Sequence, residues 1–143
     1  MSAERLQTQR IEVVAGTVNR CSFFPDDGRV WKLRYIKYMP DVSVTANDTN
    51  YVTMRAYKGD GTGTPIHAAR STTVAGTGFT RGTVLDYGVS TELPAPDVNF
   101  TASGADLEIT DANPLTIQFS HTGSGAAAAF SILARFDVVR AAS

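Results

Sequence analysis

The stretch YVTMRAYK, residues 51–58, predicts a β-strand with two different faces. Val52, Met54 and Ala56 recur at every second position, and side chains two residues apart on a strand point to the same face. The opposite face would carry polar and aromatic side chains, namely Tyr51, Thr53, Arg55 and Tyr57. A strand with one apolar face is typical of antiparallel sheets that cover a core on one side only.

Turn-forming segments border this strand on both sides and separate it from further alternating stretches. ANDTN (46–50) precedes it, and the Gly-rich GDGTGTP (59–65) follows it. Upstream, residues 30–39 alternate again, which predicts a second strand. Its two faces are expected to carry Trp31, Leu33 and Tyr35 on one side and Lys32, Arg34 and Ile36 on the other.

The last alternating stretch is long and rich in alanine. A helix over Ala126–Arg135 is the alternative, because alanine is the best helix former. We favour a strand, because the alternation continues through the β-favouring FDVV, residues 136–139. The strand faces would be Ala128, Phe130, Ile132, Ala134, Phe136 and Val138 against Ser131, Leu133, Arg135 and Asp137.

Eight or nine short strands are expected in the whole chain of 143 residues, with turn signals between them. Shorter or weaker strand patterns occur at 11–16, 66–73, 84–89, 107–110 and 115–120. Such a pattern without a convincing helix predicts an all-β, antiparallel β-sandwich, a jelly roll of about eight strands. Residues 1–10 show no periodicity, so we expect an N-terminal arm there and a single domain over 11–143.

Composition excludes several classes of function. Two His and one Cys cannot supply a zinc cluster or a disulfide framework within one chain. A net charge of −1 argues against a general nucleic-acid binder. The N-terminus is polar and no apolar run is long enough to span a membrane. We therefore expect synthesis in a cytosol, no metal or other cofactor, and no nucleic-acid or membrane partner.

No set of residues forms a recognisable catalytic motif. His67 or His121 could join Ser71 or Ser120 in a hydrolytic triad, but no nucleophile-elbow motif is present. The glycines of residues 59–64 lack the Gly-Lys-Ser/Thr of a phosphate-binding loop. We therefore expect no catalytic residues, and we expect that the protein is not an enzyme.

Tyrosine and arginine side chains outside the core positions are candidate contact residues. The tyrosines fall on two strands that could be neighbours, so they could form a carbohydrate platform or a protein interface. Alternatively, they simply cover the second face of the sandwich. Two arginines of the expected arm could order on a protein lattice. The candidate interface residues are Arg5, Arg10, Arg34, Tyr35, Tyr38, Tyr51, Arg55 and Tyr57.

Charge is distributed unevenly along the chain. Residues 1–81 hold eleven basic and seven acidic side chains, a net +4, whereas residues 82–143 hold two basic and seven acidic ones, a net −5. Complementary patches would favour packing of copies side by side or docking on a charged lattice. An ordinary mixed surface is the alternative, because strands from both halves interleave in a sandwich.

The segment WKLRYIKYMPDVSVTANDTNYVTMRAYK, residues 31–58, resembles the jelly-roll cement, or head decoration, proteins of tailed bacteriophages. The shared features are an aromatic and basic strand, then V-T-A-x-D-T-N-Y, then an alternating strand, and a long apolar last strand ending near Asp137-Val138. The resemblance covers about 60 residues, in Val30–Lys58 and Leu107–Val139, and contains no catalytic signature. Gly59–Thr101 lies outside it.

The resemblance implies a structural protein that is made in the host cytoplasm and added to the outside of the capsid. Its partners would be the major capsid protein and other copies of itself, in a homotrimer or, as second choice, a dimer. It would stabilise the head against the pressure of packaged DNA. The alternative function is a carbohydrate- or receptor-binding β-sandwich of a virion fibre, and a jelly-roll hydrolase or isomerase is a third.

Overall fold

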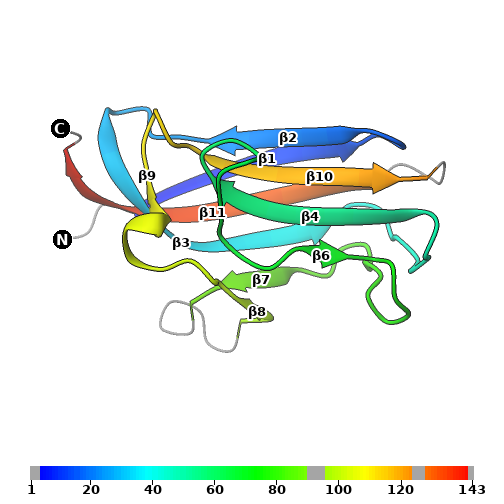
Figure 1. Ribbon diagram of the computed structural model, residues 1–143. Helices are drawn as coiled ribbons and strands as arrows, with labels where there is room; N and C mark the ends of the chain where they lie inside the picture. The colour runs from blue at the N-terminus through cyan, green and yellow to red at the C-terminus, as the bar shows by residue number, and fades with distance from the viewer. Residues whose placement is uncertain (1–3, 90–95, 124–127, 142–143) are drawn as a thin grey trace.

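The computed structural model describes residues 4–89, 96–123 and 128–141, which form two β-sheets packed face to face (Figure 1). One short 3₁₀ helix, η1 (Gly104–Leu107), interrupts the strands. The strands in chain order are β1 (Glu4–Val13), β2 (Val18–Phe23), β3 (Arg29–Pro40), β4 (Tyr51–Lys58), β5 (Thr64–Pro65), β6 (Arg70–Ser71), β7 (Leu85–Gly88), β8 (Val98–Asn99), β9 (Glu108–Ile109), β10 (Leu115–Thr122) and β11 (Ala128–Ala141).

The strand order is that of a jelly roll. Sheet A has the order β1-β11-β3-β7-β8, with β9 also paired to β3. Sheet B has the order β2-β10-β4-β5, with β6 also paired to β4. β5 and β6 both pair with β4, so they can be counted as one strand position. The chain then places β1, β11, β3 and β7 in one sheet and β2, β10, β4 and β5 or β6 in the other, with the first strand β1 beside the last strand β11. This is the strand order of a jelly roll built from two Greek keys. The predicted antiparallel sandwich is confirmed, and β7–β8 is its one parallel pair in the described part of the chain.

Strands with clear alternation lie where the sequence predicts them. β4 spans the predicted residues 51–58, and its apolar side chains Val52, Met54 and Ala56 are fully buried. β11 is a strand and not a helix from Ala128 onward. Residues 126 and 127 of the alternative helix lie outside the described residues. The weak segment 66–73 contributes little regular structure, because only the two residues of β6 lie within it; β5, also of two residues, ends just before it.

The expected N-terminal arm is wrong from Glu4 onward. These residues belong to β1, whose ten residues pair without interruption with β11, from Glu4 opposite Asp137 to Val13 opposite Ala128. The pattern was missed because the inward face of this edge strand is only half-buried up to Gln9, so polar residues are tolerated there. Main-chain hydrogen bonds to β11 hold the strand whatever its side chains are.

A β-bulge in β3 reverses the predicted faces of that strand from Tyr35 onward. Leu33 lies opposite Phe136 and Tyr35 lies opposite Arg135, so Arg34 is the extra residue. Trp31 and Leu33 point into the core before the bulge, and Ile36 and Tyr38 do so after it. The prediction that Tyr35 shares a face with Trp31 and Leu33 is therefore wrong.

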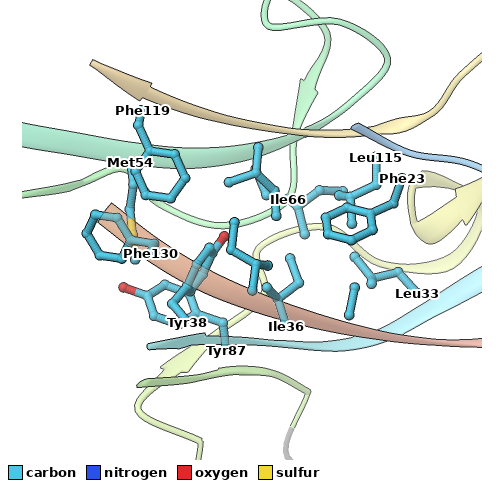
Figure 2. Packing of buried hydrophobic residues seen from close by; sticks show 14 of the residues in the cluster. Phe23, Leu33, Ile36, Tyr38, Met54, Ile66, Tyr87, Leu115, Phe119 and Phe130 are labelled. Atoms are coloured by element: carbon cyan, nitrogen blue, oxygen red, sulfur yellow. The ribbon is translucent and has the colours of Figure 1, made fainter. Parts of the chain in front are cut away.

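The core lies between the sheets and is rich in aromatic rings (Figure 2). Phe119 of sheet B stacks on Phe130 of sheet A with ring centroids 4.6 Å apart. At the other end of the core, the Phe23 ring of sheet B lies 6.5 Å from the Phe136 ring of sheet A, centroid to centroid. Contacts of this kind between the two sheets provide the main stabilisation of a sandwich.

Candidate interaction surfaces

The outer face of sheet A carries a network of ion pairs around a bulge and a tyrosine. Arg34 Nε lies 2.9 Å from Asp137 Oδ2, and Arg135 also contacts this carboxylate. Asp137 is only 7% exposed, so the two arginines compensate for its burial. The Tyr35 ring has the Lys37 ammonium 5.5 Å from its centroid on one side and the Arg135 guanidinium at 5.9 Å.

Beside this network, the same face has an apolar hollow of about 450 Å³. We call it the A hollow. Leu133 is half-buried in it and Val84 is 45% exposed at its border. Leu133 was predicted on the polar face of its strand, and an apolar residue at a solvent-facing position is the signal that could have found this hollow. The lining residues are Thr8, Gln9, Arg10, Lys37, Met39, Val84, Ser131, Ile132 and Leu133.

The outer face of sheet B carries the side chains that the alternation of β4 predicts. Tyr51, Arg55 and Tyr57 are half-buried on it. The Arg55 guanidinium lies 5.8 Å from the centre of the Tyr57 ring, and its Nε donates to the main-chain oxygen of His67. A polar hollow of about 660 Å³ lies near the end of β4, and Lys58, Asp60 and Asn113 are among the residues that line it.

The eight candidate interface residues do not form one surface. β3 and β4 belong to different sheets, so Arg34 and Tyr35 face away from the group on sheet B. The prediction that the two tyrosine strands could be neighbours is wrong. The alternation within each strand could not indicate which sheet the strand joins, because that depends on pairings between residues far apart in sequence.

Arg5, Arg10 and Tyr38 have different surroundings from those predicted. Arg10 lies on β1, and its Nε is 3.1 Å from Asp41 Oδ2. Arg5 covers the Trp31 ring at 5.8 Å instead of extending from a free arm. Tyr38 is completely buried between the sheets, so its candidate role as an exposed contact is wrong.

Tyr38 belongs to a buried polar cluster with His67 and Tyr87 (Figure 2 labels both tyrosines). Its hydroxyl lies 2.8 Å from His67 Nε2, and His67 Nδ1 lies 2.8 Å from the main-chain oxygen of Ala68. A carbonyl can only accept, so Nδ1 carries the proton and Nε2 accepts from the Tyr38 O–H. Burial lowers the pKa of His67 to about 4 and raises that of Tyr38 well above its usual value.

Tyr87, the third member of the cluster, contacts His67 through its ring and not through a hydrogen bond. Its ring centroid lies 4.5 Å from that of His67. Its buried hydroxyl makes no hydrogen bond of normal geometry with the described residues, but the Arg70 guanidinium interacts with it and partly offsets the rise that burial causes in its pKa. Both ring nitrogens of His67 are engaged by Tyr38 and Ala68, so this histidine is held as a neutral structural group.

The opposite charges of the two chain halves meet within one molecule. Lys37 Nζ lies 2.8 Å from Asp86 Oδ1, and Arg34 pairs with Asp137. Each pair joins a basic residue of the first half to an acidic residue of the second. The expectation that these charges meet across a lattice interface is therefore wrong for these pairs, because adjacent strands of sheet A bring them together.

Within residues 4–89, 96–123 and 128–141, no group of three His, Cys, Asp or Glu side chains is placed to hold a metal ion. Helices long and apolar enough to cross a membrane are also absent from those ranges.

No protein-family model and no curated protein sequence matches the chain. A chain from the study titled "Bacillus endospore appendages form a novel family of disulfide-linked pili" has 12% sequence identity and a TM-score of 0.45, over 97% of this chain and 92% of that one. A chain of the T13 particle of infectious bursal disease virus has 13% identity and a TM-score of 0.26, over 96% and 40%. A chain of the VP2 subviral particle of that virus has 13% sequence identity and a TM-score of 0.27, over 96% of this chain and 42% of that one.

The present chain spans about two fifths of the length of the viral chains that it matches. The similarity to the pilus and virus-particle structures is weak, and TM-scores below 0.5 assign no function. The function proposed below therefore depends on the residues of this chain.

Proposed function

We propose that the chain is a structural, non-enzymatic decoration protein of a tailed-bacteriophage capsid. In this role it is made in the host cytoplasm, binds the major capsid protein on the outside of the head, and stabilises the shell as a homo-oligomer. One observation carries the proposal. The two segments that resemble cement proteins, 30–58 and 107–139, supply two adjacent inner strands of each sheet: β11 and β3 in sheet A, and β10 and β4 in sheet B.

The A hollow is the surface that we assign to the capsid. Inner strands β3 and β11 provide Met39 and Leu133, and Lys37 and Arg10 border the apolar floor. An apolar centre with a charged border is the usual anatomy of a protein interface. The occupant that fits is an apolar side chain of the coat protein flanked by carboxylates, and many copies on a shell add avidity to a weak single contact.

Co-sedimentation with capsids tests this proposal. Capsids of the source virus that lack the protein are mixed with the purified chain and pelleted, and we expect the chain to pellet with them. Leu133→Asp places a charge in the A hollow and should weaken binding by about tenfold or more. Tyr57→Ala, on sheet B, is the matched control and should bind like the wild type. A wild-type chain that stays in the supernatant would refute the proposal.

Carbohydrate or receptor binding by a virion fibre is the second candidate function. Its support is the half-buried Tyr51, Arg55 and Tyr57 on sheet B, near a polar hollow. Tyrosine faces stack on sugar rings, and polar side chains select their hydroxyl groups. On a glycan array, binding that Tyr57→Ala abolishes and Leu133→Asp preserves would favour this function over the capsid contact.

A further inference from the structure

β1 is a long edge strand that is hydrogen-bonded on one side only. It ends the order of sheet A, and its pairing with β11 covers all ten residues without a register shift. Figure 1 shows β1 and β2 along the same side of the sandwich. At the opposite edges, β5 and β8 have two residues each. β1 is therefore the edge best suited to accept another strand.

Two of the features that usually protect an edge strand, proline and a β-bulge, are missing from β1, although it does carry charged side chains. Its charged side chains are paired within the chain: Glu4 with Arg135, Arg5 with Asp27, and Arg10 with both Glu12 and Asp41. An approaching strand therefore meets a nearly neutral row of side chains, while the main-chain groups that point away from β11 remain available for a ladder.

The sequence of β1 is complementary to itself when it is reversed about Gln7. We propose that β1 pairs antiparallel with β1 of a second copy, with Gln7 on the two-fold axis. In this register Glu4 lies opposite Arg10 and Leu6 lies opposite Thr8, each twice, and Arg5 lies opposite Gln9. Opposite charges in directly opposed pairs stabilise an antiparallel sheet, whereas pairing about Thr8 would place Glu4 opposite Glu12.

The charge pairs can form without breaking those inside each chain. A guanidinium has five N–H donors, so Arg10 can keep Asp41 and Glu12 and still bind Glu4 of the second copy. Pairing also covers Leu6, whose side chain is 55% exposed on the outer face of sheet A. Sheet A then continues across the two-fold axis as one sheet of two copies, which is an isologous dimer.

This dimer supplies the self-association that the proposed function includes, and it selects the dimer over the trimer. Leu6 of the second copy lies beside Thr8, in the row that continues through Leu133 to Lys37. The A hollows of the two copies therefore lie on one continuous outer face, which a lattice can contact at two points. The dimer is tested on the purified chain without capsids, so either proposal can fail without the other.

The mass in solution and charge exchange test the β1 dimer. Analytical ultracentrifugation should give twice the chain mass of 15.3 kDa. Glu4→Arg or Arg10→Glu alone makes the opposed pairs repulsive and should weaken the dimer by about tenfold or more. The double variant restores opposite charges across the axis and should recover dimerisation. In the double variant the intrachain ion pairs of residues 4 and 10 are still lost, so recovered dimerisation can only come from the contact between the two copies.

Disulfide trapping tests the register. Cys21 is the one native cysteine, and burial raises its pKa to about 11, which makes it a poor nucleophile. It is nevertheless replaced, and Cys21→Ala serves as the background for both variants. Gln7→Cys puts two thiols directly opposite each other, within the range of a disulfide. Thr8→Cys puts them about 7–8 Å apart on the diagonal, beyond that range. We expect only Gln7→Cys to cross-link under mild oxidation. A monomeric wild type, a trimer unaffected by either charge reversal, or cross-linking through Thr8→Cys alone would overturn the proposal.

Discussion

On one side of the sandwich, β1 and β2 run for ten and six residues; on the other, β5, β6 and β8 have two residues each. We call these the regular side and the irregular side. Ladders and apolar packing hold the regular side. On the irregular side individual side chains replace the ladder: Thr72 Oγ1 accepts the Val52 N–H, and His67 binds Tyr38. The regular side therefore ends in a long edge strand, whereas the short strands of the irregular side depend on buried polar contacts.

The largest effect is expected from truncating the apolar packing of β11. Phe136→Ala removes a fully buried ring that contacts Trp31 and Phe23, and should lower the free energy of unfolding by about 3–5 kcal/mol. Val139→Ala on the same strand, where the side chain is 44% exposed, should change it by about 0.5 kcal/mol or less. Urea unfolding measures both. A loss below about 1 kcal/mol for Phe136→Ala would mean that packing does not hold the regular side.

Acid should weaken the irregular side through His67. Its folded pKa is about 4 against an ordinary value of about 6.5, so the unfolded chain binds a proton more readily between these values. The stability contributed by neutral His67 is complete above pH 6.5 and falls as the pH drops toward 4. Between pH 7.5 and 4.5 the loss is about 2.5 kcal/mol.

His67→Gln is the variant that isolates this titration. It keeps a polar side chain but removes the ionisable ring, while the carboxyl groups titrate equally in both proteins. Urea midpoints at the two pH values should fall much less in the variant than in the wild type. Equal pH dependence in both proteins would contradict the assignment to His67.

Loss of a single buried hydrogen bond should have a smaller effect. Tyr38→Phe removes the O–H that His67 Nε2 accepts, and should cost about 1–2 kcal/mol. Tyr87→Phe is the matched variant, because it removes a buried hydroxyl that makes no hydrogen bond of normal geometry in the described part of the chain and only interacts with Arg70. It should be neutral or slightly stabilising. Equal losses for the two variants in thermal unfolding would show that the Tyr38–His67 hydrogen bond makes no special contribution to this side.

The smallest effect is expected where the two sides join, at the pairing of β3 with β7. Asp86→Asn removes the carboxylate that Lys37 contacts, and both side chains are about one-third exposed. Exposed pairs of this kind contribute about 0.5 kcal/mol or less. The difference from the wild type should shrink further in 1 M salt, as measured by urea unfolding. A loss several times larger would make this ion pair part of what holds the irregular side.

The regular elements could be predicted from sequence because their alternation is a local pattern. β4 and the faces of β11 follow from every-second-residue spacing in YVTMRAYK and in residues 128–138. The Arg34 bulge could not be predicted, because one extra residue is set by its partner β11 and leaves no local mark. β1 was not predicted, because its inward face is half-buried and polar up to Gln9 and so shows no apolar alternation. Its strand conformation follows from the pairing with β11.

The candidate contact surface was less predictable than the fold. Tyr35 and Tyr51 were grouped although their strands join different sheets, and a pairing between distant residues decides this. Tyr38 was assigned to the surface, yet the bulge turns it inward to His67. The A hollow escaped prediction because its lining comes from four separate segments of the chain.

Amide hydrogen exchange at several protein concentrations tests most directly whether β1 is the open, self-pairing edge. In the monomer, the β1 amides that point away from β11 exchange quickly, and pairing in the dimer protects them. Protection of about half of the amides of Glu4–Arg10 should therefore rise with concentration, while β5 and β8 should not change. Unchanged β1 exchange in a sample that is dimeric by mass, or new protection at β5 or β8, would contradict the account.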